Sequence, residues 1–102
     1  MTMFSVSVFM EMACESDDEP LWEERILLIE AGSEDEAVEK AEARAKSNEH
    51  SYSADQDRSI EVKFDSIDRV YPIEGLLRDG AELFSRFLRN SEVSSLKTPF
   101  DE

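Results

Sequence analysis

Residues 4–12 read Phe-Ser-Val-Ser-Val-Phe-Met-Glu-Met, and this stretch decides the fold. Every even-numbered residue in it is apolar, whereas serine or glutamate occupies most of the odd-numbered positions. A period of two places alternate side chains on opposite faces of a β-strand. The stretch therefore predicts a strand with one face in the core, and it leaves Phe9 on the other face.

A polar segment follows and ends at Pro20, which predicts a hairpin loop before a second strand at residues 21–31. In this second strand, residues 26–29 are apolar on both faces. Strands of that kind usually lie inside a sheet. We therefore expect the second strand to be internal, with a cover on each face.

The next segment predicts a helix. Ser33 and Glu36 have the spacing of a capping box, and acidic residues occupy the first turn, where the helix dipole favours them. Between Glu36 and Lys46 the apolar residues form a narrow stripe of small side chains, namely Ala37, Val38, Ala41 and Ala45. Such a stripe favours a close approach of the helix to the sheet.

The second half of the chain has weaker signals. Residues 48–58 are polar and predict a loop, and residues 60–64 alternate as a third strand. The parity of the apolar residues then changes, which predicts a β-bulge near Asp65 and Ser66. Residues 76–88 fit either a helical stripe or a turn before a short strand.

These elements predict an α+β fold in the order strand, strand, helix, strand, strand. We expect an antiparallel sheet of about four strands with one main helix packed on one face. Residues 1–90 would form a single domain, and residues 91–102 a flexible C-terminal tail.

Charge limits the choice of partners. The 102 residues include 25 Asp and Glu against 11 Lys and Arg, a formal net charge of −14. Such a field repels phosphate groups, so we expect neither nucleic acid nor a membrane as a direct partner. The single cysteine, Cys14, fits the reducing cytoplasm, and the N-terminus lacks the basic leader of a signal peptide.

The sequence offers few groups for catalysis or for a cofactor. The three glycines do not have the spacing of a phosphate-binding loop, and one cysteine and one histidine cannot form a structural zinc site. We therefore expect no cofactor, no metal and no catalytic residue. His50, near Tyr52, would be the only imidazole acid or base, but a histidine in a polar loop is more often solvated or caps a helix end.

A cluster of polar residues is the candidate for a small-molecule site. Its members are Glu23, Glu24, Arg25, His50, Tyr52 and Arg86. Consecutive strand residues point to opposite faces, so one of the two glutamates should face a covered side and need a partner such as Arg25 or Arg86. A structural salt bridge is the favoured interpretation, and a ligand-binding or enzymatic site at the sheet end is the alternative.

A second candidate is an apolar surface. If Val8 lies opposite Leu27 and Val6 opposite Ile29 under the helix, four apolar residues share the other face of the sheet: Phe9, Trp22, Ile26 and Leu28. One helix cannot cover both faces. Either the chain after Pro72 folds over this face, or the face is an interface for another protein or a second copy.

Several stretches carry a resemblance to a known family. They are Trp22-Glu23-Glu24-Arg25-Ile26-Leu27-Leu28-Ile29-Glu30-Ala31, Ser33 with Glu36-Ala37, Glu49-His50-Ser51-Tyr52, Val62 with Phe64, and Gly80-x-Glu82-Leu83-Phe84-Ser85-Arg86-Phe87. Over residues 3–88 the chain resembles a bacterial family known as domain of unknown function number 4288. The resemblance implies an α+β domain without implying an activity, and it favours a strand at residues 82–88. Residues 56–58 depart from it, because similar sequences tend to have a glycine turn there.

Three functions remain open at this point. The first is a non-catalytic interaction domain, such as an inhibitor or immunity-like protein that presents its acidic surface to a basic partner. The second is a small ligand-binding or enzymatic domain that uses the polar cluster. The third is a homodimeric domain whose second sheet face is closed by self-association.

Overall fold

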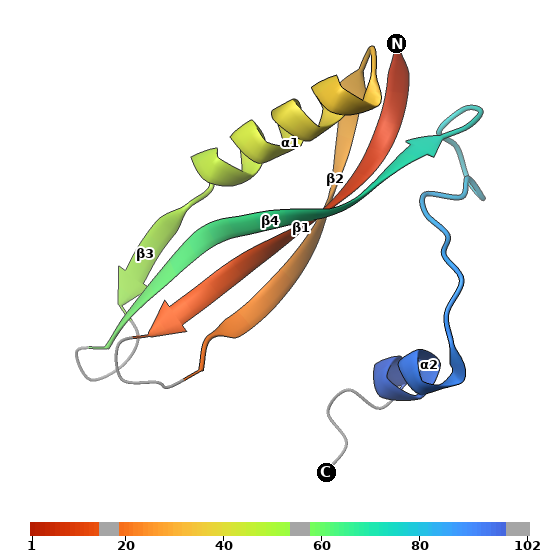
Figure 1. Ribbon diagram of the computed structural model, residues 1–102. Coiled ribbons are helices and arrows are strands. Elements are labelled where there is room, and N and C mark those ends of the chain that lie inside the picture. The colour runs from red at the N-terminus through yellow and green to blue at the C-terminus, as the bar shows by residue number, and fades with distance from the viewer. Residues whose placement is uncertain (15–18, 54–57, 98–102) are drawn as a thin grey trace.

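The computed structural model describes residues 1–14, 19–53 and 58–97, and shows a curled sheet with one long helix (Figure 1). The predicted hairpin loop at residues 15–18, the departure at residues 56 and 57, and the tail beyond residue 97 lie outside the described residues. The elements in chain order are β1 (Thr2–Cys14), β2 (Leu21–Ala31), α1 (Glu34–Ser47), β3 (His50–Ser53), β4 (Ser59–Ile73) and α2 (Asn90–Lys97).

The strands form one antiparallel sheet in the order β2-β1-β4-β3. The strand predicted from residues 4–12 is therefore central, and both of its edges are hydrogen-bonded. Its even-numbered residues form the middle of the core, and Val6, Val8 and Met10 are fully buried. The predicted α+β fold is confirmed.

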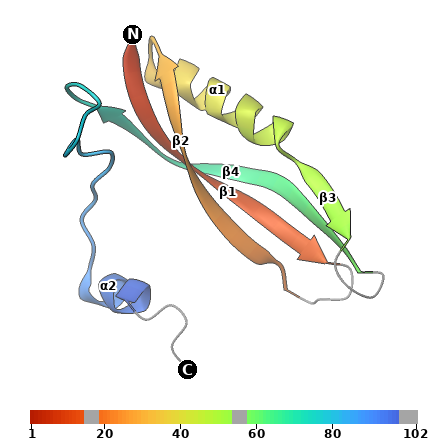
Figure 2. The ribbon, with the colours of Figure 1, turned by 180° about the vertical axis from the view of Figure 1, so that it is seen from behind.

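Helix α1 packs on one face of the sheet through its alanines (Figures 1 and 2). Ala37 and Ala41 are fully buried, and Ala45 is 2% exposed, in the same core cluster as β1. Side chains this small let the helix lie close to the strands. The predicted alanine stripe therefore is the contact between α1 and the sheet.

The helix begins as predicted at Ser33, whose Oγ accepts a hydrogen bond from the backbone N–H of Glu36 at 3.1 Å. The carboxylate of Glu36 accepts a hydrogen bond from the backbone N–H of Gly32. In an ideal capping box this carboxylate would bind the N–H of the cap residue itself. The box is thus shifted by one residue, but it still satisfies two backbone donors at the end of the helix.

The register between β1 and β2 differs from the prediction by two residues. Val6 lies opposite Leu27, and Phe4, not Val6, lies opposite Ile29. An even shift keeps every side chain on its predicted face, because the period of a strand is two. The hydrophobic pattern specifies this parity, whereas the hairpin loop decides which of the registers with the same parity forms.

Strand β4 contains the predicted bulge and a second one. Met10 pairs with Phe64 and Phe9 with Ser66, so Asp65 is left without a partner on β1. A similar step between Ser7 and Val8 leaves Asp68 unpaired. The first bulge confirms the prediction near Asp65 and Ser66, and the two together return alternate apolar residues of β4 to the core face.

Three predictions about the elements were wrong. Strand β2 lies at an edge of the sheet and not inside it, since β1 has β4 as its other neighbour. Residues 50–53, predicted as loop, form the short strand β3. Residues 82–88 form neither a strand nor a helix, and the helix α2 begins after them at Asn90. Both errors in the second half arose from short segments with little hydrophobic periodicity.

The close contact between α1 and the sheet can be tested by replacing one alanine with leucine on the buried side of the helix and another on its exposed side. We expect Ala41→Leu to lower the free energy of unfolding by about 1–3 kcal/mol, because the site has no room for three additional carbons. The control is Ala43→Leu on the exposed side of the same helix, which should change stability by less than about 0.5 kcal/mol. Urea denaturation measures both, and equal effects would contradict the packing described here.

The helix cap gives a second test. Ser33→Ala removes the acceptor for the Glu36 N–H and should lower the free energy of unfolding by about 1 kcal/mol. Ser33→Asp restores an acceptor and should retain nearly wild-type stability. Thermal or urea denaturation of the three proteins measures this, and an alanine variant as stable as the aspartate variant would show that the cap contributes nothing.

Candidate functional site

The face of the sheet opposite α1, called the second face below, carries the predicted apolar surface. Its side chains come from odd-numbered residues of β1, even-numbered residues of β2 and the residues of β4 that lie opposite those of β1, such as Lys63, Ser66, Arg69 and Tyr71. Phe9, Trp22, Ile26 and Leu28 all lie on it, because an even register shift conserved their parity. Helix α1 is on the other side of the sheet (Figures 1 and 2).

This surface is open where β2 crosses it. Trp22, Ile26 and Leu28 are 49%, 59% and 54% exposed, whereas Phe9 on the central strand is half-buried. The three exposed residues follow one another at every second or fourth position of an edge strand. They form an apolar row along one border of the second face, and Glu24 lies in this row between Trp22 and Ile26.

The chain after β4 covers this face only in part. We call residues 74–97 the C-terminal arm. Leu83 of the arm lines a shallow apolar hollow of about 90 Å³ with Ser5, Ile26, Leu28 and Ile73. Ser5 is only 5% exposed. The small serine side chain on β1 therefore lies at the bottom of this hollow, and the larger side chains around the hollow cover it.

A second contact anchors the arm beside β4. The ring of Phe84 packs edge-on against Tyr71 with centroids 5.5 Å apart, and the guanidinium of Arg69 lies 4.9 Å from the Phe84 centroid. The hydroxyl of Tyr71 donates to Glu82 at 2.6 Å and accepts a longer bond of 3.4 Å from Ser85. These contacts hold residues 82–85 against the sheet.

Charged groups lie between the arm contact and the open row. Ser7 Oγ donates to Glu24 Oε2 at 2.6 Å, and the guanidinium of Arg69 lies 4.0 Å from the same oxygen. Arg69 also pairs with Asp68 at 2.7 Å. The charge of Arg69 in the middle of the second face is therefore already balanced by carboxylates, and Glu24 is held within the apolar row, between Trp22 and Ile26.

The predicted polar cluster is divided among several parts of the molecule. Glu23 and Arg25 form an ion pair of 2.7 Å on the helix side of β2, opposite to the side that Glu24 faces. His50 and Tyr52 lie on β3, at the other edge of the sheet from β2, with their rings stacked at 5.9 Å. The structure thus brings together Glu23 with Arg25 and His50 with Tyr52, but not the two pairs.

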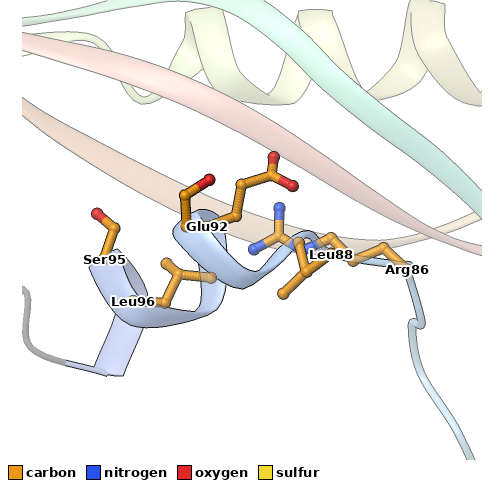
Figure 3. Close-up of a pocket in the computed structure, with 6 residues that line it drawn as sticks. Arg86, Leu88, Glu92, Ser95 and Leu96 are labelled. Atoms are coloured by element: carbon orange, nitrogen blue, oxygen red, sulfur yellow. The ribbon is translucent and has the colours of Figure 1, made fainter.

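The last member of that cluster, Arg86, lies on the arm. With Leu88, Glu92, Ser95 and Leu96 it lines an open hollow of about 340 Å³ beside α2 (Figure 3). All the residues around this hollow come from one short stretch of chain. It is therefore the groove of a helix and its leading segment, and not a site assembled from several elements.

Sequence reasoning missed the residues that organise the second face, namely Arg69, Tyr71, Leu83 and Phe84. The two bulges reversed parity twice within a few residues, so the alternation around Arg69 did not indicate a face. The arm contains no regular element before residue 90, and periodicity therefore could not place Leu83 or Phe84. The only available signal was the family resemblance of residues 80–87, which include Phe84.

Other kinds of site find little support in the described part of the chain. No group of three or more histidine, cysteine, aspartate or glutamate residues there is arranged to hold a metal ion. Neither of the described helices is long and apolar enough to cross a membrane.

A hollow of about 520 Å³ runs between β2 and α1, where Lys40 Nζ donates to the backbone oxygen of Glu30 at 2.7 Å.

Comparison with known proteins gives one match. No curated protein and no solved structure is significantly similar to the chain. A family model described as domain of unknown function (DUF4288) matches residues 3–85, which span β1 to β4 and the first half of the arm. This range ends just after the contacts of Phe84. The chain is a member of the DUF4288 family.

Proposed function

We propose that this protein is a non-catalytic protein-interaction domain, which binds a positively charged partner protein through the second face in the manner of an inhibitor or immunity protein. The observation that carries the proposal is the open apolar row of Trp22, Ile26 and Leu28 on an otherwise packed sheet. Contiguous apolar residues that stay exposed in a folded domain mark interaction surfaces, and tryptophan is a frequent anchor in them.

Charge specifies the kind of partner. Exposed Glu24 and Glu30 alternate with the apolar residues along β2, and the whole chain carries a formal charge of −14. Acidic residues interspersed with apolar ones attract a partner with the reverse charge and accelerate the encounter. A basic protein with an exposed apolar residue fits this surface, and we expect the encounter to take place in the reducing cytoplasm.

An enzymatic or small-molecule function has less support. Its candidate residues lie on opposite faces of β2, on the other edge of the sheet and on the arm, so they do not surround one cavity. Catalysis by general acids and bases requires such groups within hydrogen-bonding reach of one substrate. The open apolar row, in contrast, also favours self-association.

The proposal predicts which side of β2 a partner needs. Tagged protein recovered from its own cells should retain a basic partner, and Leu28→Asp should lose it because a carboxylate replaces an apolar contact in the row. Leu21→Asp is the matched control: it makes the same change on the same strand, at a residue that is 68% exposed but faces the helix side. The partner should remain bound to this control.

Salt gives an independent check on the same complex. We expect the association rate to fall by about tenfold or more between low and high ionic strength, since exposed charges are screened. Stopped-flow or surface-based kinetics with the recovered partner measure this rate. A partner that binds Leu28→Asp as well as wild type, or with a salt-independent rate, would refute the proposal.

A further inference from the structure

Helix α2, at the end of the C-terminal arm, is not packed on the rest of the domain. Among the described residues, α2 has no Cα atom within 8 Å of any other helix or strand. The radius of gyration is 16.4 Å, whereas about 13 Å is expected for a compact chain of 100 residues. Figure 1 shows the arm leaving the end of β4 and running beside the sheet to α2. The arm is thus an extension of the fold.

Although it is extended, the arm is rich in large apolar side chains that remain exposed. Phe87 is 105% exposed, which means that none of the described residues covers its ring. The other exposed apolar residues of the arm are Leu76, Leu77, Leu83, Leu88 and Leu96. A disordered tail would be poor in such residues. An arm with this composition gains free energy when another surface buries it.

The same chain presents a surface that its own arm does not cover. Leu83 lines a hollow with Ile26 and Leu28, and Phe84 packs against Tyr71 of β4, but the row of Trp22, Ile26 and Leu28 remains about half exposed with the arm in place. Helix α2 has no Cα atom within 8 Å of the sheet. One molecule therefore has two unpartnered apolar sets, one on the sheet and one on the arm.

The arm also differs from the rest of the chain in its net charge. Residues 1–73 contain 19 Asp and Glu against seven Lys and Arg, whereas residues 74–97 contain four of each. Within the arm, Arg86 and Arg89 flank Phe87 and Leu88. The arm is thus the segment of the chain that can approach an acidic sheet without net repulsion, and it places two cations beside two apolar anchors.

We infer that the partner of the second face in the purified protein is a second copy of the chain, whose residues 86–97 lie across the row of Trp22, Ile26 and Leu28. The exchange is reciprocal, so a two-fold axis relates the copies and both arms are buried. The inference rests on the proposed function, because it takes the second face as the binding surface. A basic partner protein would have to displace the arm of the second copy.

The first experiment measures the mass of the full chain in solution over the micromolar range by analytical ultracentrifugation. We expect about twice the 11.7 kDa of the single chain. Phe87→Ser should weaken self-association by about 10- to 100-fold, as expected for loss of an aromatic anchor. Since Phe87 is fully exposed within one chain, this variant should fold normally. Leu21→Ser, at an exposed leucine off the second face, should leave the dimer intact.

A second experiment shows whether the arm crosses to the other copy. Glu30→Cys on the second face and Ser91→Cys on the arm are made in separate chains that also carry Cys14→Ala, one chain bearing a tag. A short bismaleimide should join tagged to untagged chains in the mixture more efficiently than it joins identical chains in either protein alone. A linkage found only between identical chains, or no linkage, would overturn the reciprocal exchange.

The outcomes separate this inference from the proposed function. A monomer at all concentrations, or a dimer that Phe87→Ser does not weaken, overturns the inference while binding of a basic partner to the second face can still be observed. A dimer that Phe87→Ser dissociates supports the inference even when no basic partner is recovered. The dimer contact is mainly apolar, so it should persist in high salt, where a complex with a basic protein weakens.

Discussion

The whole structure depends on the fact that one helix packs on one face of a four-stranded sheet. Strand β1 presents fully buried Val6, Val8 and Met10 to that helix, and the alanines of α1 allow a close contact. This arrangement gives the domain one well-packed core. It also leaves the second face to whatever the rest of the chain, or another chain, can provide. The presence of a single helix therefore explains both why one face of the sheet is buried and why the other is partly exposed.

Much of this core could be predicted from the sequence, because strong local signals agreed with the tertiary fold. The alternation of residues 4–12, the cap at Ser33 and the alanine stripe each specify a local structure, and each was observed. The errors arose where the decisive information was not local. The position of β2 at an edge depends on which strand pairs with the other side of β1, and its own apolar residues cannot show that.

The candidate site was predictable only in part, for a similar reason. Parity alone placed Phe9, Trp22, Ile26 and Leu28 on one face, since a register error of two residues does not change parity. The polar residues, in contrast, could be assembled only with knowledge of the sheet order. That order places His50 and Tyr52 at the edge remote from Glu23 and Glu24. Because two bulges change the parity of β4, alternation could not show that Arg69 and Tyr71, which contact the arm, lie on the second face.

The open outer edge of β2 has a consequence for colloidal behaviour. The outer edge of an edge strand, next to an exposed apolar row, is a template for uncontrolled edge-to-edge aggregation, and natural proteins protect such edges with charge. Here Lys40 Nζ donates a hydrogen bond to the backbone oxygen of Glu30, and acidic residues alternate with apolar ones along the strand. The charge of −14 makes molecules repel one another at neutral pH. As the pH approaches the isoelectric point near 4.3, that repulsion disappears and the solubility of the protein should reach its minimum.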